Sequence, residues 1–249
     1  MRPAHAPRAE FDEVMLSIPI LARLLGGNGG TKEAQDEFVQ EMQAKAFKID
    51  PATRYYLLSD FHLEPDGPSD PEPLLKLLSR LLSEGGIGGV FILGDIAARP
   101  GIKYETLAKN HPKLFDTLYR LSVSTPVFLV QGECDLELDP PEYLRAVERF
   151  EDEKWIFIHG WQFDPSVEVI RDEEDEEFLH VRRAEPDGAK TLAGLRDLKQ
   201  RKNKHVVFGH LHKAGYVETG LTCLGHWTGG SADYAILRNG QIFLQAGRG

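Results

Sequence analysis

Five predicted strands each end at residues that can bind metal ions or transfer protons. An aspartate, glutamate or histidine follows each strand within a few residues of its last apolar position. In open α/β sheets, ligands bind at the edge formed by the carboxyl ends of the strands. We therefore expect these side chains to meet at one site. The five runs are Ser59-Asp60-Phe61-His62, Gly94-Asp95, Gly132-Glu133-Cys134-Asp135, His159-Gly160 and Gly209-His210-Leu211-His212.

The chemistry of this set indicates bound metal ions. Three carboxylates and four imidazoles stand at the candidate positions, and crowded carboxylates repel one another unless cations neutralise them. A mixed nitrogen and oxygen ligand set suits Mn, Fe, Zn or Co better than Ca or Mg. Seven ligands with one shared aspartate are what two ions about 3.5–4 Å apart require. We expect two divalent transition-metal ions, with manganese first among the candidates. Such a pair clamps a phosphate and activates water for in-line attack.

The elements that would position these residues alternate between strands and helices. Short apolar runs that alternate with helical patterns are typical of an α/β fold with mostly buried strands. The predicted strands are 55–59, 89–93, 126–130 and 155–158, and the predicted helices are 73–83, 104–121 and 142–150.

The carboxyl-terminal part departs from this rhythm at residues 164–204. This stretch contains the acidic run 172–177 and a predicted helix at 191–202, and we interpret it as an insertion. It is either a lid, whose Arg182 and Arg183 would hold a second phosphate, or a solvated surface loop. Five strands follow, the last two joined by the hairpin signal Asn239-Gly240. Together the elements predict a layered α/β sandwich with mixed sheets. These strands are 205–208, 215–218, 221–224, 234–238 and 241–245.

The first 50 residues differ from the rest and carry no recognisable chemistry. They predict two helices, at 10–25 and 32–48, separated by a glycine-rich stretch. We expect domains at 1–50, a helical extension, and at 51–249, the domain with the candidate site.

Composition excludes some classes of function. The 249 residues carry a formal net charge of -10, which disfavours non-specific binding to nucleic acid. No apolar run is long enough to span a membrane, and the two cysteines form no disulfide framework. We therefore expect a cytoplasmic protein without nucleic-acid partners. The sequence leaves the oligomeric state open.

The ordered runs resemble the motifs of the calcineurin-like metallophosphoesterase family. Those motifs are D-x-H, G-D, G-N-H/R/C-D, H-G and G-H-x-H, and the resemblance covers residues 55–245. The run 130–135 is similar to the G-N-C-D form of small bacterial and archaeal phosphodiesterases. The tail Leu224-Gly225-His226-Trp227 resembles the L-G-D-W segment of UDP-2,3-diacylglucosamine diphosphatases. The resemblance implies a four-layer α/β/β/α sandwich with mixed sheets.

The resemblance also implies a role for each candidate residue. The nucleophile would be a hydroxide that bridges the two ions, so no side-chain nucleophile is needed. Asp60, His62, Asp95 and Cys134 match catalytic positions of the family. Asp60, His62 and His212 would hold the first ion, Asp95 would bridge, and Glu133, His159 and His210 would hold the second.

Two positions depart from the family pattern. Glu133 stands where the family has Asn, which adds a negative charge beside the second ion. Cys134 stands where many members carry a His or Arg that donates to the leaving oxygen, and a thiol donates poorly at pH 7. A non-catalytic retromer subunit of the same fold also has an acidic residue in place of that Asn.

The expected function is hydrolysis of a phosphodiester, phosphomonoester or pyrophosphate bond. The substrate would be a small phosphorylated molecule, either nucleotide-like or lipid-linked. The alternative from another class is a metal-poor, inactive family member that acts as a protein-binding scaffold. A metal-dependent nuclease is a third interpretation, which the acidic net charge disfavours.

We expect four other residues near these motifs to have structural roles rather than to bind metal. We expect Asp135 to brace the third loop rather than to bind metal, and His111 to lie on the surface at a helix interruption before Pro112. We expect Trp227 to be a wall or core aromatic residue. His226 replaces an aspartate of the diphosphatase tail, and a structural role is the preferred interpretation over a hydrogen bond in the site.

Overall fold

The computed structural model describes residues 47–66, 72–171, 179–183, 187–227 and 231–248. The chain divides into two units, Met1–Lys48 and Ile49–Gly249, and the second holds all of the described helices and strands. The helices predicted at 10–25 and 32–48 lie outside the described residues, except for residues 47 and 48. The extension predicted at 1–50 therefore stays a prediction.

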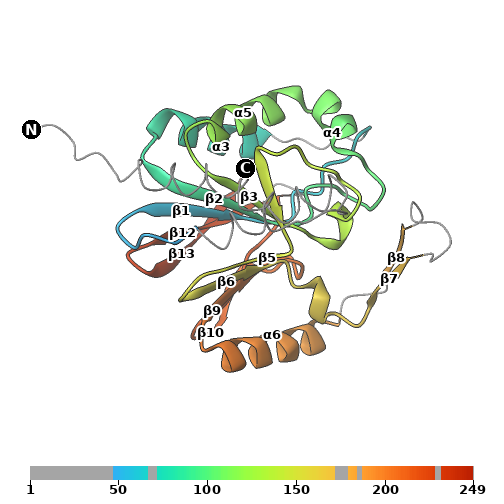
Figure 1. The fold of residues 1–249 in the computed structure, drawn as a ribbon, viewed down its shortest axis with the longest axis vertical. Coiled ribbons are helices and arrows are strands. Elements are labelled where there is room, and N and C mark those ends of the chain that lie inside the picture. The colour runs from blue at the N-terminus through green and yellow to red at the C-terminus, as the bar shows by residue number, and fades with distance from the viewer. Residues whose placement is uncertain (1–46, 67–71, 172–178, 184–186, 228–230, 249) are drawn as a thin grey trace, which may run out of the picture. The chain divides into compact units, whose positions relative to one another are not determined.

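Two mixed β-sheets pack face to face in the second unit, with helices over the outer face of each (Figure 1). This is the predicted four-layer α/β/β/α sandwich. The six-stranded sheet has the order β13 (Gln241–Arg248), β12 (Ser231–Arg238), β1 (Arg54–Leu58), β2 (Ile87–Leu93), β3 (Val127–Val130) and β4 (Leu144–Val147). The five-stranded sheet has the order β10 (Gly215–Glu218), β11 (Leu221–Cys223), β9 (His205–Phe208), β6 (Trp155–Ile158) and β5 (Arg149–Glu151).

The strands that precede the candidate site are parallel within each sheet. Strands β1, β2 and β3 pair in parallel, and so do β6 and β9, so their carboxyl ends share an edge. The pairs β3–β4 and β9–β11 are also parallel, whereas β1–β12, β12–β13, β5–β6 and β10–β11 are antiparallel. The β12–β13 hairpin turns at Asn239 and Gly240, whose φ angles of 51° and 69° are those of a two-residue hairpin turn.

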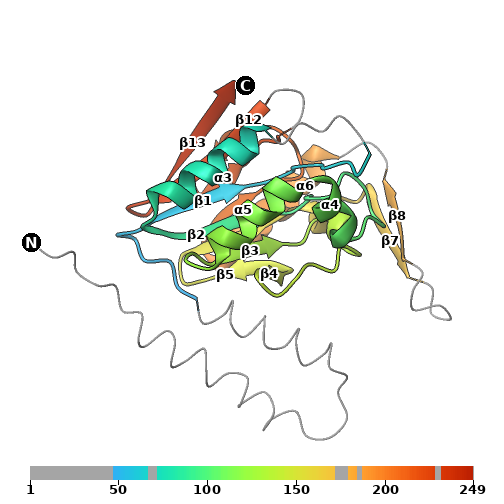
Figure 2. The ribbon, with the colours of Figure 1, turned by 90° about the horizontal axis from the view of Figure 1, so that it is seen from above.

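The helices cover the sheets through leucine-rich faces. Helices α3 (Glu72–Glu84), α4 (Tyr104–Asn110) and α5 (Pro112–Ser122) lie over the six-stranded sheet, as Figure 2 shows from above. Leucines recur along α3 at the spacing of one helix face, and the face packs on the sheet. Helix α6 (Gly188–Lys202) covers the five-stranded sheet with the buried Leu195 and Leu198.

Aromatic rings fill the space between the two sheets. The rings of Phe91 and Phe128 stack at 4.8 Å between centroids, and Phe91 meets Phe157 edge-on at 4.7 Å. Phe150 packs against the same group, 5.3 Å from Phe157. Burial of each such side chain stabilises the fold by about 1.5–3 kcal/mol, so this layer fixes one sheet on the other.

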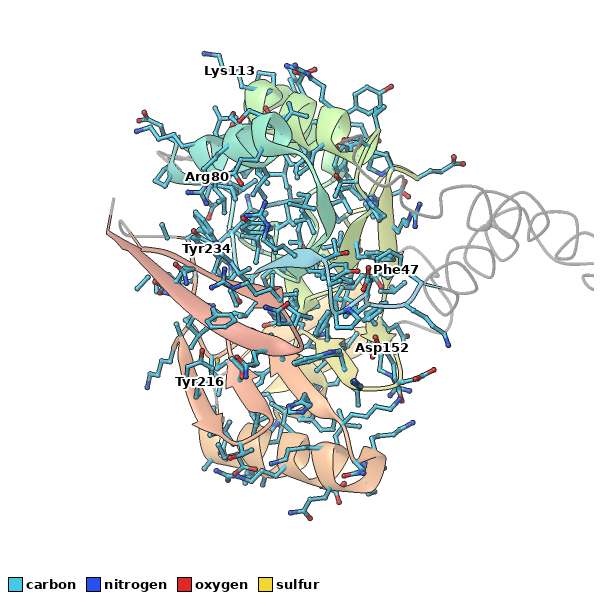
Figure 3. All side chains as sticks on the ribbon, turned by 90° about the vertical axis from the view of Figure 1, so that its left-hand side faces the viewer. Phe47, Arg80, Lys113, Asp152, Tyr216 and Tyr234 are labelled. Atoms are coloured by element: carbon cyan, nitrogen blue, oxygen red, sulfur yellow. The ribbon has the colours of Figure 1, made fainter. Side chains whose placement is uncertain are left out.

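A hydroxyl group also joins the sheets at one pair of edges. Tyr216 of β10, labelled in Figure 3, donates a hydrogen bond to the carbonyl of Ile242 at 2.7 Å. The same hydroxyl accepts from the backbone N–H of Leu244 at 3.3 Å. Ile242 and Leu244 belong to β13, the edge strand of the six-stranded sheet. The tyrosine thus links the edge strands of both sheets.

The helix predicted at 142–150 is wrong, because this segment forms strands β4 and β5. The pattern looked helical because Leu144, Val147 and Phe150 recur every three residues, and all three are buried. In the structure β4 pairs with β3, and β5 pairs with β6. The chain therefore crosses between the sheets at Glu148, and this change of sheet produces the three-residue spacing.

The helix predicted at 104–121 is two helices, α4 and α5, that meet at His111. The interruption before Pro112 is confirmed, since proline cannot continue the preceding helix. The surface position predicted for His111 is wrong. Its side chain is buried, and its Nε2 lies 3.0 Å from the carbonyl oxygen of Glu64.

The stretch 164–204 contains a hairpin and then helix α6. Strands β7 (Val167–Arg171) and β8 (Leu179–Arg183) form a separate two-stranded sheet, which extends away from the main sheets in Figure 1. The acidic run 172–177 and the side chains of Arg182 and Arg183 lie outside the described residues. Among the described helices, none is long and apolar enough to cross a membrane.

Candidate metal centre

The loops after five parallel strands bring all seven predicted ligand residues together. Their ligand atoms form overlapping groups in which every atom lies within 4.8 Å of the others. The loops after β1, β2 and β3 reach this site from the six-stranded sheet, and those after β6 and β9 from the five-stranded sheet. Two of these groups share no residue: Asp60, His62 and His212 form the first group, and Glu133, His159 and His210 form the second group.

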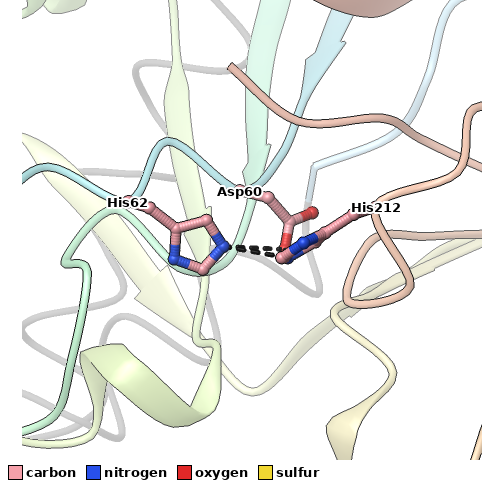
Figure 4. A group of neighbouring side chains, drawn as sticks. All are labelled: Asp60, His62 and His212. Atoms are coloured by element: carbon pink, nitrogen blue, oxygen red, sulfur yellow. Dashed lines mark hydrogen bonds and ion pairs between the residues drawn. The ribbon is translucent and has the colours of Figure 1, made fainter. Parts of the chain in front are cut away.

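The first group, whose three side chains Figure 4 shows, is partly exposed to solvent. The Nε2 atoms of His62 and His212 lie 2.9 Å apart, and His212 Nε2 lies 3.2 Å from Asp60 Oδ1. The side chains of His62 and His212 are 14% and 38% exposed, whereas the Asp60 side chain is fully buried. Two imidazole nitrogens and one carboxylate oxygen thus converge at a place that is partly exposed to solvent.

The second group is buried. Glu133 lies between two imidazoles, with Oε2 at 3.1 Å from His159 Nδ1 and Oε1 at 3.2 Å from His210 Nδ1. Despite these distances, neither Nδ1 atom makes a hydrogen bond of acceptable geometry with a described residue. Buried ring nitrogens without hydrogen bonds, aimed at a carboxylate, fit a shared cation. A set of two nitrogens and a carboxylate suits a transition metal.

Asp95 lies between the two groups, beside Cys134. Its Oδ2 is 3.9 Å from His62 Nε2 and its Oδ1 is 3.9 Å from His159 Nε2. The backbone N–H of Cys134 donates to Oδ1 at 3.1 Å, and the thiol donates to Oδ2 at 3.2 Å. Asp95 therefore occupies the position that a bridging carboxylate needs. The buried Cys134 orients it, and the catalytic role expected for this thiol stays a prediction.

The backbone at the site adopts conformations that most residues avoid. The left-handed region is rarely occupied by residues other than glycine, and when occupied it costs on the order of 1 kcal/mol. Five of the seven predicted ligand residues lie there. They are Asp60, His62, Asp95, His210 and His212, with φ between 47° and 66°.

Two glycines of the motifs are required by close approach of the backbone to the carboxylates. A Cβ atom at Gly132 would overlap the carboxylate and the backbone nitrogen of Asp95. A Cβ atom at Gly209 would overlap the hydroxyl of Ser59 and the carboxylate of Asp60. The next residue, His210, donates its backbone N–H to that carboxylate at 3.2 Å.

The pKa shifts of the buried groups indicate that the carboxylates of this centre need positive charge beside them. Burial raises the pKa of Asp95 and His159 lowers it, but Glu133 and the other carboxylates nearby leave it at about 8. Burial also raises the pKa of Glu133, yet His159 and His210 outweigh burial and hold this pKa well below its usual value. Burial lowers the pKa of His159, and Asp95 and Glu133 raise it well above its usual value. Protons thus occupy positions that bound cations would take.

Asp164 is a site residue that sequence reasoning missed. Its Oδ2 lies 2.8 Å from Nε2 of His210, the ring nitrogen that faces away from Glu133. Asp164 follows His159 within the same strand-end loop, but its partner is 46 positions further along the chain. No spacing in the sequence distinguishes it from an ordinary loop aspartate.

The residues given structural interpretations behave largely as expected. Asp135 braces the third loop, since its carboxylate accepts from the backbone N–H groups of Ala97 at 3.2 Å and Gly132 at 3.1 Å. Trp227 is buried against Phe61, and its backbone N–H donates to the carbonyl of Asp60 at 3.1 Å. His226 Nδ1 lies 3.2 Å from the carbonyl oxygen of His212.

Comparison with known proteins places the chain in a family. The family model for calcineurin-like phosphoesterases matches residues 53–214, which is more than half of the chain and includes all seven predicted ligand residues. No curated protein sequence matches the chain significantly.

Solved structures provide further likenesses. The E. coli phosphoesterase YfcE is 18% identical, with 78% of this chain and 98% of that chain covered and a TM-score of 0.39. The nuclease MPE of Pseudomonas putida is 16% identical over 77% of this chain and 87% of that chain, with a TM-score of 0.41. A dimetal phosphatase of Danio rerio is 12% identical over 80% of this chain and 98% of that chain, with a TM-score of 0.46. On the match of the family model, this chain belongs to the calcineurin-like phosphoesterase family.

Proposed function

We propose that the chain is a metal-dependent hydrolase that cleaves a phosphodiester, phosphomonoester or pyrophosphate bond at a dinuclear centre. Asp60, His62 and His212 would hold the first ion, and Asp95 would be shared. Glu133, His159 and His210 would hold the second. The observation that carries the proposal is the convergence of these seven side chains, from five loops of two sheets, within bonding reach of common points.

The bound ions would supply Lewis acidity and an activated water molecule for attack on phosphorus. The protein's own residues hold this chemistry in place. The Asp60 carboxylate accepts from the backbone N–H of His210, and the Asp95 carboxylate accepts from the backbone N–H of Cys134. These hydrogen bonds fix the carboxylates before any ion binds. Without cations the buried carboxylates would repel a phosphate, so the same residues make hydrolysis dependent on metal.

The access side of the centre is the first group. Because His62 and His212 are partly exposed and the second group is buried, a substrate phosphate would approach from the side of these two histidines. We infer a small phosphorylated substrate that is nucleotide-like or lipid-linked. Product analysis after incubation with a cyclic nucleotide, a dinucleotide and a nucleotide-sugar lipid would separate these classes.

The scaffold alternative is disfavoured by the four imidazoles. All four are present, and the two in the second group direct ring nitrogens without hydrogen bonds toward the Glu133 carboxylate. A protein that served only as a docking surface would not need this arrangement. We infer manganese as the physiological ion from the mixed ligand set. Cys134 and Cys223 are both buried and form no disulfide, which supports a proposed location in the reducing cytoplasm.

Metal content and hydrolysis measured together test the proposal. The full chain would be stripped with chelator, reloaded with Mn²⁺, and assayed on bis(p-nitrophenyl) phosphate. We expect two ions per chain, and activity that returns only with metal. Asp95→Asn should lower activity by more than the roughly 10–100-fold that loss of an outer partner causes. Asp197→Asn is the matched control, because this exposed carboxylate on α6 pairs with Arg201 and not with the centre. Full activity of Asp95→Asn, or an inactive wild type that binds no ion, would refute the proposal.

A further inference from the structure

We propose that Asp164 is a positioning residue for the second ion, and that it couples the β7–β8 hairpin to the metal centre. The inference rests on the proposed function, since it concerns an ion held by Glu133, His159 and His210. Asp164 lies outside the seven predicted ligands and outside the runs that follow the strands. Its carboxylate contacts both a ligand histidine and the two ends of the hairpin.

The carboxylate of Asp164 is buried and surrounded by N–H groups. Oδ2 lies 2.8 Å from Nε2 of His210. Oδ1 accepts from the backbone N–H of Ser166 at 2.9 Å and from that of Asp187 at 3.3 Å. Three N–H groups around one carboxylate favour its ionised form, which accepts hydrogen bonds. The two carboxylate oxygens of Asp164 thus face three N–H groups, those of the His210 ring and of the backbone at Ser166 and Asp187.

This contact determines which nitrogen of His210 carries the proton. An ionised carboxylate can only accept, so the proton of a neutral His210 must lie on Nε2. The lone pair then lies on Nδ1, which is 3.2 Å from Glu133 Oε1, where the second ion would bind. A metal ligand needs this lone pair, and an outer carboxylate that fixes the tautomer strengthens binding.

The same carboxylate closes the base of the hairpin. Ser166 immediately precedes β7, and Asp187 follows β8 and caps α6 by accepting from the N–H of Lys190 at 3.1 Å. Oδ1 of Asp164 therefore joins the residue before β7 to the N-cap of α6, which follows β8 in the chain, while Oδ2 holds the ligand histidine. A displacement of the hairpin base that moves Asp164 must also move or release the ring of His210.

An isosteric variant gives the sharpest test, because asparagine has one acceptor where aspartate has two. In Asp164→Asn the amide oxygen would satisfy the N–H groups of Ser166 and Asp187, and the amide nitrogen would then donate to His210 Nε2. The proton of His210 would move to Nδ1, and the second ion would lose a ligand. Asp164→Ala leaves the tautomer free, so we expect the second ion to bind more weakly in Asp164→Asn than in Asp164→Ala. A residue with a merely structural role would give the opposite order.

Two measurements on the full chain decide the outcome. Calorimetric titration with Mn²⁺, and with Co²⁺ read by its absorption, should show second-ion affinity lowered about 10–100-fold in Asp164→Asn, with the first ion unchanged. Imidazole NMR at saturating Zn²⁺, where a bound ion replaces any proton between Nδ1 and Glu133, should show His210 protonated on Nε2 in the wild type and on Nδ1 in Asp164→Asn. Asp197→Asn is again the control, and thermal melts of metal-free samples check folding. An unchanged tautomer in Asp164→Asn, or second-ion affinity equal to the wild type in both variants, would overturn the proposal.

A shortened hairpin tests the coupling. Replacement of residues 168–182 by a Gly-Ser turn should weaken the second ion several-fold and leave the first unchanged. When the shortened hairpin is combined with Asp164→Asn, the two losses of second-ion affinity should be less than additive, because both changes act through the carboxylate of Asp164. Additive effects would overturn the coupling. If the wild type binds a single ion, the dinuclear function fails, while the His210 tautomer still decides whether Asp164 positions the ring.

Discussion

The two sheets contribute different chemistry to the metal centre. The six-stranded sheet supplies every carboxylate among the predicted ligands, together with one histidine, and the five-stranded sheet supplies only histidines. Neither sheet alone combines the ligands of either group, so bound ions would cross-link the two sheets. Metal binding is therefore expected to contribute to stability as well as to catalysis. Asp60, His62, Asp95 and Glu133 come from the first sheet, and His159, His210 and His212 come from the second.

The largest effect on stability is expected when a histidine of the second group is removed. His210→Ala leaves the buried Glu133 carboxylate opposite a single imidazole, and removal of one partner from a buried pair costs roughly 3–5 kcal/mol. We expect a large fall in the free energy of unfolding, measured by urea denaturation, together with loss of hydrolysis. His212→Ala is the control, since its side chain is 38% exposed. It should abolish hydrolysis and leave the metal-free stability almost unchanged. Equal destabilisation by both variants would contradict the comparison.

Substitution of the carboxylate in the second group should change ion affinity and turnover in opposite directions. Glu133→Gln keeps an oxygen ligand of the same length but removes a charge, which is worth on the order of 4 kcal/mol at 4 Å and an effective dielectric of about 20. We expect the second ion to bind about a thousandfold more weakly. Turnover at saturating Mn²⁺ should rise, because a less negative ligand set leaves the ions stronger Lewis acids. Titration calorimetry and steady-state kinetics measure the two effects. Lower turnover at full metal occupancy would show that Glu133 is adapted to this centre.

Removal of the ions tests the cross-link directly. At a free metal concentration of about 100 times the dissociation constant, binding stabilises the folded state by about 2.7 kcal/mol. Chelation should therefore lower the melting temperature of the wild type. It should lower that of Asp95→Asn much less, since this variant lacks the shared carboxylate. Calorimetric melts with and without chelator provide the comparison, and an equal shift in both proteins would show that the ions do not join the sheets through Asp95.

The smallest effect is expected for the hydrogen bonds of Tyr216, which join the two sheets without metal. Tyr216→Phe removes the hydroxyl that joins β10 to β13, and loss of its hydrogen bonds should cost about 1 kcal/mol. Ion affinity and turnover should not change, because Tyr216 belongs to none of the ligand groups. A change in ion affinity in this variant would show that the edge contact and the centre are coupled. Urea denaturation and calorimetric titration would be compared with the wild type.

The sequence was sufficient to predict that the candidate ligand residues would meet at one site. Each candidate run follows a short apolar run with the length and residue types of a buried strand, and parallel strands bring their carboxyl ends together. Asp60 and His210 could therefore be predicted as neighbours, although they lie 150 positions apart and meet through a backbone hydrogen bond. The sequence was informative here because an apolar run marks each buried strand and the polar residues directly after it mark where the strand ends.

Two features depended on tertiary contacts and could not be predicted in this way. The segment 142–150 has the spacing of a helix, but pairing with β3 and β6 turns it into two edge strands in different sheets. Asp164 acquires its role only when His210 lies beside it. A loop aspartate has many partners available in principle, and its own neighbours in sequence do not select one.

The left-handed backbone at five ligand residues has a consequence for selection. Glycine would relieve the backbone strain at the partly exposed His62 and His212, so a screen for thermal stability alone should recover glycine at these two positions and lose the first group with them. The presence of histidine at these two positions is then explained by function and not by folding. Stability-guided engineering of this protein should leave Asp60, His62, Asp95, His210 and His212 fixed.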